Sequence, residues 1–146
     1  MKLCEEIMTR DPVCCLPGDS IGEAARIMGE MDIGAVPVVS DRETRRLAGI
    51  VTDRDLAIRA LAKRLGPQTP VEEIMTRKLH TCREEDRLAE AVERMEKHQV
   101  RRMPVVDASG AIIGIIAQAD LAMKAGAPVM VAEFMEEISH PHPPMF

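Results

Sequence analysis

Hydrophobic positions along this chain follow two spacings in turn, one typical of helices and one typical of strands. Apolar residues between Ile21 and Met31 recur every three or four positions, which predicts an amphipathic helix, and Ser20 with Glu23 matches a capping box at its start. Short apolar runs bounded by Pro, Gly and polar turns predict strands. In order, the pattern predicts a strand at 12–16, a helix at 21–31, strands at 35–39 and 47–51, and a helix from 52 or 53 to about 65.

The same order of elements is predicted a second time. It comprises a strand near 79–82, a helix at about 86–99, strands at 103–107 and 112–116, and a helix from 118 toward 124. Each half therefore runs strand, helix, strand, strand, helix. Because helices and strands interleave along the chain, we expect an α/β fold in which helices cover sheet faces.

The two halves are copies of one unit. The tetrapeptide Ile-Met-Thr-Arg at 7–10 returns at 74–77, and matching residues continue at an offset of 67. Beyond the polar turn at 40–46 the offset is 65, a change of length that a turn tolerates. One copy of about 55 to 60 residues would bury only about 60% of its surface, so we expect the copies to share a core. We expect a first repeat at 1–66, a second repeat at 67–126, and a C-terminal amphipathic segment with a Pro- and His-rich tail at 127–146.

Composition and charge narrow the classes of partner. The chain has 146 residues, of which 11 are Met, 2 are Phe and none is Trp or Tyr, so it offers no aromatic platform for stacking bases. A net charge of -5 disfavours nonspecific binding to nucleic acid or to an anionic membrane. No apolar run is long enough to span a membrane, and the N-terminus lacks the apolar core of a signal peptide. We expect a cytoplasmic protein without a nucleic-acid or membrane partner.

Three motifs carry a family resemblance. They are Ile-Met-Thr at the start of each copy, a strand that ends in Pro-Val-Val, and the segment Gly-Ile-Val-Thr-Asp-Arg-Asp at 49–55 with its counterpart at 114–120. Through them the chain resembles a tandem pair of CBS (cystathionine beta-synthase) domains from about Glu5 to Gly126. The stretches 32–37, 52–55 and 98–104 resemble the small stand-alone bacterial members, such as the hypoxic response proteins. The resemblance implies two β-α-β-β-α repeats related by a pseudo-two-fold axis, an arrangement known as a Bateman module.

The resemblance also implies a regulatory module with two clefts between the repeats. Relatives bind AMP, ATP, NAD or S-adenosylmethionine there, and we expect a regulatory adenine nucleotide, with AMP or ATP favoured, and no required cofactor. We expect no attached catalytic domain, a signal that passes to a separate effector protein, and a homodimer. The residues assigned to the clefts are Asp11, Val13, Gly34, Ala35, Val36, Pro37, Ile50, Thr52, Asp55, Lys78, His80, Arg101, Arg102, Met103, Pro104 and Asp120.

Thr52 and Asp55 have two interpretations. At the start of a helix, the Asp55 carboxylate can accept hydrogen bonds from both hydroxyls of a ribose, while Thr52 and unpaired N–H groups receive a phosphate oxygen. Gly34 and Ala35 would let the backbone approach the ligand, and aliphatic side chains would form a slot for adenine. The spacing Thr-x-x-Asp is equally that of a helix capping box, which needs no ligand. The two roles are compatible.

The second copy departs from this pattern. Ala117 replaces the hydroxyl of Thr52, whereas Asp120 retains the carboxylate. Arg101 and Arg102 take the place of small residues, and arginine suits forked contacts to phosphate, although an Arg pair is also common on a solvated surface. The sequence therefore predicts two unlike clefts, with the Thr52 cleft as the main site.

His80 and Lys78 occupy the positions that match Val13 and Asp11 in the first copy. The match assigns them to the second cleft. A lone His at the start of a strand is also an ordinary surface residue, and that alternative stays open.

Cysteine and histidine provide little sign of a metal or catalytic centre. Cys14 and Cys15 are adjacent, and strand alternation predicts that one thiol enters the core and the other faces outward. His140 and His142 belong to a Pro-rich tail, so we expect no metal site. No nucleophile and base are paired in sequence, so we expect no enzymatic activity. Two functions remain, a nucleotide-sensing module and a ligand-free homodimeric interaction module.

Overall fold

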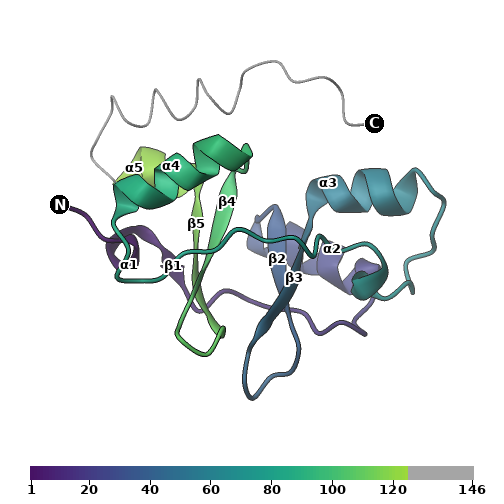
Figure 1. Ribbon diagram of the computed structural model, residues 1–146. Coiled ribbons are helices and arrows are strands. Elements are labelled where there is room, and N and C mark those ends of the chain that lie inside the picture. Colours follow the sequence, from purple (N-terminus) through teal and green to yellow (C-terminus); the bar gives the residue numbers. More distant parts are fainter. Residues whose placement is uncertain (125–146) are drawn as a thin grey trace. The chain divides into compact units, whose positions relative to one another are not determined.

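A computed structural model describes residues 1–124 of the chain, and these residues fall into two compact units. Unit 1 combines residues 1–11 with residues 80–124, and unit 2 spans Pro12–Leu79 (Figure 1). The predicted C-terminal segment at 127–146 lies outside the described residues. The two units are defined by contacts between residues, whereas the predicted boundaries at 1–66 and 67–126 are defined by the sequence repeat. Those boundaries stay a prediction.

Unit 2 contains a two-stranded antiparallel sheet with helices around it. Its elements are α2 (Ile21–Met31), β2 (Ala35–Val39), β3 (Leu47–Thr52), α3 (Asp53–Asp55), the π-helical η1 (Leu56–Leu61) and the 3-10 turn η2 (Val71–Glu73). Strands β2 and β3 pair directly, and Cys15 adds one parallel bridge to Val38. A core of aliphatic and sulfur-containing side chains from α2, both strands and η2 lies on one face of the sheet.

Unit 1 repeats this plan with one extra strand. Its elements are α1 (Cys4–Ile7), β1 (Thr9–Arg10), α4 (Leu88–His98), β4 (Arg102–Val106), β5 (Ile112–Ala117) and α5 (Gln118–Lys124). The strand order is β1-β5-β4, and Cys82 bridges Val105 as Cys15 bridges Val38 in unit 2. A second, separate core gathers side chains from α1, α4, β4 and β5.

Each unit contains the segment that precedes the other repeat in sequence. We call residues 1–11 the first lead-in and residues 69–77 the second lead-in. In the first lead-in, the N–H of Cys4 donates to the carbonyl of Asp86 at 2.9 Å; in the second, the N–H of Val71 donates to Asp19 at 2.8 Å. These bonds match at the offset of 67, so both copies dock their lead-in in the same way.

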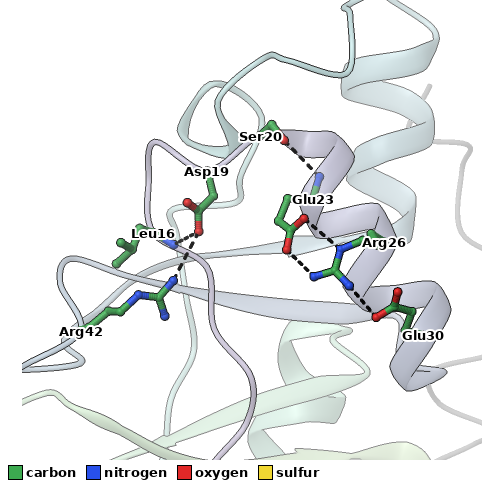
Figure 2. A network of polar contacts seen from close by, with 7 residues as sticks. All are labelled: Leu16, Asp19, Ser20, Glu23, Arg26, Glu30 and Arg42. Atoms are coloured by element: carbon green, nitrogen blue, oxygen red, sulfur yellow. Dashed lines mark hydrogen bonds and ion pairs between the residues drawn. The ribbon is translucent and has the colours of Figure 1, made fainter.

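A network of polar contacts holds the start of α2 and the turn that precedes it (Figure 2). The Ser20 hydroxyl accepts from the N–H of Glu23 at 3.1 Å, as predicted, but the Glu23 carboxylate pairs with Arg26 and does not complete the box. Asp19 accepts from the N–H of Leu16 at 2.9 Å. The predicted cap is therefore only half formed.

The α/β class and the order of elements are confirmed, and most bounds agree within two residues. Two details differ. The strands predicted at 12–16 and 79–82 are reduced to the single bridging residues Cys15 and Cys82. The repeated tetrapeptide was not predicted to form a strand, yet Thr9 and Arg10 pair with β5, and Thr76 bridges Ile50. Strand pairing with a distant segment overrides local pattern here.

Candidate nucleotide site

The residues predicted to bind ligand divide between the two units. Unit 2 holds Val13, Gly34, Ala35, Val36, Pro37, Ile50, Thr52, Asp55 and Lys78, while unit 1 holds Asp11, His80, Arg101, Arg102, Met103, Pro104 and Asp120.

In unit 2 the sheet register gathers four predicted residues on one face. Ala35 lies opposite Thr52, and Pro37 lies opposite Ile50. Directly opposed residues point to the same side of a sheet, so these four share a face. Val36 points to the other side and belongs to the core of unit 2. Its predicted contact with a ligand stays a prediction.

Thr52 and Asp55 form a complete capping box at the end of β3. The Thr52 hydroxyl accepts from the N–H of Asp55 at 3.0 Å, and the Asp55 carboxylate accepts from the N–H of Thr52 at 3.0 Å. Asp55 is only 7% exposed and is the single buried charged residue among those described. A buried carboxylate needs such partners, because an unpaired one would be strongly destabilised. The capping interpretation is therefore confirmed, and it leaves the ribose role open.

Two further residues hold the Asp55 carboxylate. The Thr76 hydroxyl donates to it at 3.3 Å, and the Arg59 guanidinium lies 3.6 Å away. Arg59 also donates to the carbonyls of Ile74 at 3.4 Å and Met75 at 3.5 Å. Asp55 thus links the first turn of α3 to the second lead-in.

The sequence interpretation missed both of these partners. Arg59 is four residues beyond Asp55, a spacing that places the two side chains on one helix face. Thr76 belongs to the repeated tetrapeptide, and that repetition was the only sign in the sequence that Thr76 has a role.

Unit 1 has the same carboxylate in a reduced setting. Asp120 accepts from the N–H of Ala117 at 2.9 Å, which preserves one half of the box, and from the Thr9 hydroxyl at 3.4 Å. Ala117 lacks a hydroxyl, so the reciprocal bond is lost. Arg102 lies directly opposite Ala117, as Ala35 lies opposite Thr52. At this position of the sheet, the cationic side chain of Arg102 therefore replaces the methyl group of Ala35, and the methyl group of Ala117 replaces the hydroxyl-bearing side chain of Thr52.

The remaining predicted residues have varied settings. His80 is half-buried, and its ring stacks on that of His98 with centroids 3.6 Å apart. Asp11 adopts a left-handed conformation, with φ at 50°, and its N–H donates to Ile113. Lys78 and Arg101 are exposed. Met103 belongs to the core of unit 1. Ligand contact by these residues stays a prediction.

The expectation for the adjacent cysteines is confirmed for Cys15, which belongs to the core of unit 2, and is wrong for Cys14, which was expected to face outward. Both Cys14 and Cys15 are buried, because the Arg45 guanidinium lies 3.5 Å from the Cys14 sulfur and covers the side that was expected to face outward. Burial raises the pKa of both thiols, that of Cys15 to about 11. Such thiols are protonated and unreactive at neutral pH. Across residues 1–124, no three potential metal-ligand side chains lie close enough to hold an ion.

The repeated fold and the paired Asp sites agree with the family assignment. Residues 4–61 and 71–125 each match the CBS domain, so the chain belongs to the CBS domain family. The two copies make it a CBS pair, or Bateman module.

Small CBS proteins are similar to the chain over almost its whole length. It is 36% identical over 140 residues to the CBS domain-containing protein YhcV of Bacillus subtilis, covering 96% of this chain and 97% of YhcV. It is 33% identical over 142 residues to Hypoxic response protein 1 of Mycobacterium tuberculosis, covering 97% and 96%. A match to inosine-5'-monophosphate dehydrogenase of Methanocaldococcus jannaschii, 33% identical over 83% of this chain, covers only 23% of that enzyme.

Solved structures of similar proteins contain adenosyl ligands. The CBS domain pair of MJ0100, in complex with 5'-methylthioadenosine and S-adenosyl-L-methionine, has a TM-score of 0.76 and 32% identity and covers 86% of this chain and 100% of that one. CBSX2 in complex with AMP has a TM-score of 0.74 and 25% identity, covering 86% and 96%. Among the described helices, none has the length and apolar character needed to cross a membrane.

Proposed function

We propose that this CBS pair senses an adenosine-containing ligand, such as AMP, ATP, NAD or S-adenosylmethionine, and transmits its presence to a separate effector protein. The ligand would lie in clefts between the repeats, as the family resemblance implies. The observation that carries the proposal is the buried Asp55 carboxylate at the end of β3, which has a counterpart in Asp120. Relatives with the same fold bind 5'-methylthioadenosine, S-adenosyl-L-methionine and AMP.

The contacts of Asp55 suggest how binding becomes a signal. A ribose has two adjacent hydroxyls, and both would donate to this carboxylate. Thr76 and Arg59 already contact the same oxygens at 3.3 to 3.6 Å, distances that leave them weakly held. A ribose would therefore compete with the second lead-in for Asp55. Displacement of Thr76 and Arg59 would loosen that segment and so pass the signal along the chain.

The second copy supports a different ligand preference. Arg102 supplies a cation opposite Ala117, where the first copy has Ala35 opposite Thr52. Guanidinium groups bind phosphate oxygens through two parallel hydrogen bonds. We infer that Arg102 gives the second site an added preference for phosphate-bearing nucleotides, while the site of Asp55 is the main adenosyl site.

A thermal-shift panel with AMP, ADP, ATP, NAD, 5'-methylthioadenosine and S-adenosylmethionine tests the proposal. A ligand at a hundred times its dissociation constant should raise the free energy of unfolding by about 2.7 kcal/mol. If none of the six compounds changes the Tm at millimolar concentration, the sensing function is wrong.

Substitution of the two carboxylates locates the main site. Asp55→Ala should weaken binding by about 1.5 to 3 kcal/mol, the size of hydrogen bonds to a charged group, as measured by titration calorimetry. Asp53→Ala is the matched control, because Asp53 is exposed in the same helical turn and its carboxylate accepts from the neighbouring N–H of Arg54. Normal binding by Asp55→Ala together with lost binding by Asp120→Ala would move the main site to unit 1.

The second candidate is a ligand-free homodimeric interaction module. Leu61 is 76% exposed, and Leu65, one turn further along the chain, is 37% exposed. Exposed apolar side chains in a cluster are common at protein interfaces. Leu61→Glu should leave the fold intact and weaken self-association in sedimentation experiments. A dimer that forms normally in this variant would exclude this face.

A further inference from the structure

Two buried cysteines from distant parts of the chain meet in unit 1. Cys4 is 0% exposed and Cys82 is 2% exposed, and both belong to the same core cluster. Backbone bonds hold each of them in place: the N–H of Cys4 donates to Asp86 at 2.9 Å, and the N–H of Cys82 donates to Pro104 at 3.1 Å. The pairing of the two side chains is also the largest influence on the pKa of each thiol. The sulfur atoms are therefore neighbours in a fixed frame.

Unit 2 has the same pair of positions with different chemistry. At the offset of 67, Cys4 corresponds to Val71, and Cys82 corresponds to Cys15. Val71 and Cys15 are both 0% exposed and belong to one core cluster. The fold thus brings these positions together in both units. Only in unit 1 does each position carry a thiol.

We propose that Cys4 and Cys82 are a site of reversible oxidation, at which a peroxide or a low-molecular-weight disulfide converts the two thiols into one intramolecular disulfide. The bond would fasten the first lead-in to the second repeat. This inference does not depend on the proposed ligand.

The contact between the thiols indicates the order of the chemical steps. Pairing with Cys82 lowers the pKa of Cys4, against the opposing effects of burial and Asp86, while the same pairing and burial raise the pKa of Cys82. The Cys4 thiolate would attack hydrogen peroxide, forming a sulfenic acid and releasing hydroxide, which takes up the thiol proton as water. The Cys82 sulfur then attacks the Cys4 sulfur, its proton leaves with the hydroxyl as a second water, and the disulfide forms. Two thiols lose two electrons in total, and the peroxide gains them.

The burial of both thiols sets a condition on the reaction. An oxidant reaches Cys4 only when the first lead-in undocks, and α1 within that segment is a single turn of four residues. Reaction should therefore be faster in dilute urea. Once formed, the bond closes a loop that contains all of unit 2, and closure of a long loop restricts the unfolded chain.

The test treats the full chain with hydrogen peroxide or oxidised glutathione and then alkylates it in strong denaturant. We expect two of the four thiols to resist alkylation, a peptide containing Cys4 to be joined to one containing Cys82 in the mass spectrum, and thiol reductant to reverse both changes. The oxidised chain should unfold about 5 to 10 °C higher than the reduced chain.

The equivalent residues of unit 2 suggest matched variants. Cys4→Val copies the residue of unit 2, so it should fold, keep all remaining thiols reactive and show no rise in Tm with oxidant. Val71→Cys should create a second link, to Cys15, under the same treatment. Full alkylation of the oxidised wild-type chain, stable sulfinic acid at Cys4, or a link through Cys14 or Cys15 in its place would overturn the proposal. A Cys4–Cys82 link that leaves the Tm unchanged would overturn its fastening role.

Discussion

The carboxylates of Asp55 and Asp120 occupy equivalent positions in the two units, yet they have different surroundings. Both accept a bond from the N–H three residues earlier and from the threonine of the repeated tetrapeptide. Only Asp55 has the reciprocal bond from a threonine cap. The bonds that dock each lead-in are the same in the two units, whereas the residues opposite the helix start differ. The duplication has therefore kept the scaffold and varied the site.

The largest effect should come from a scaffold position that both units share. A Cβ atom at Gly49 would lie 2.6 Å from the sulfur of Met75 and 3.0 Å from the carbonyl oxygen of Thr76; at Gly114 the same distances apply to Met8 and Thr9. Glycine here lets the lead-in approach the strand. Gly49→Ala and Gly114→Ala should each lower the free energy of unfolding by about 1 to 3 kcal/mol, as measured in urea.

Gly29→Ala is the control for both glycine variants. Gly29 lies within α2, and a Cβ added there meets no atom within 4 Å. Alanine should stabilise this helix by about 0.5 to 1 kcal/mol. If one of the two strand glycines tolerates alanine and the other does not, the lead-ins are not docked equivalently and the comparison fails.

Alkaline pH should distinguish the cysteine of unit 2 from an ordinary thiol. Burial, assisted by Asp19 and Glu23, raises the pKa of Cys15 from its usual 9.0 to about 11. The folded chain therefore keeps this proton at pH values where the unfolded chain has lost it. The stabilisation is complete below about pH 9 and is lost as the pH rises through 11, a change on the order of 2 kcal/mol. Urea unfolding at several pH values measures it.

Cys15→Ala provides the comparison for this pH dependence. The variant loses some core packing at every pH, but its stability should fall less steeply between pH 9 and 11 than that of the wild type. An unchanged slope would mean that Cys15 does not titrate with unfolding. Cys14 and Cys82, whose pKa values are also raised, contribute to the slope that remains in the variant.

Local pattern predicted the elements of this fold because each is short and its spacing is regular. Strand β2, for example, has the predicted bounds of 35–39. The bridges at Cys15 and Cys82 are different, since each contributes only one residue to a sheet and no local pattern distinguishes that from a full strand. The sequence also did not predict that each lead-in packs in the unit of the other repeat. A repeat in the sequence shows which segments match, but it does not show which copy a segment packs against.

The candidate site was predictable in part. The sequence indicated Thr52, Asp55 and Asp120 through the spacing of a helix start, and the structure confirms the cap. Thr76 was missed because its contact depends on tertiary placement of the second lead-in, whereas Arg59 lies four residues after Asp55, a local spacing that the sequence interpretation overlooked. Cys14 was misjudged for a related reason, since the residue that buries it, Arg45, lies in a turn that the pattern marks only as polar.

The smallest effect tests the difference between the two helix starts directly. Thr52→Ala removes the reciprocal capping bond and should lower the free energy of unfolding by about 1 kcal/mol, whereas Ala117→Thr should raise it by up to about that amount by supplying the missing acceptor to Asp120. The double variant exchanges the caps between the units, so its stability should return close to that of the wild type. Urea unfolding of the three variants measures this. A higher free energy of unfolding for Ala117→Thr would indicate that the second repeat lacks a cap in favour of space opposite Arg102. A lower value would indicate that Arg102 already occupies this space.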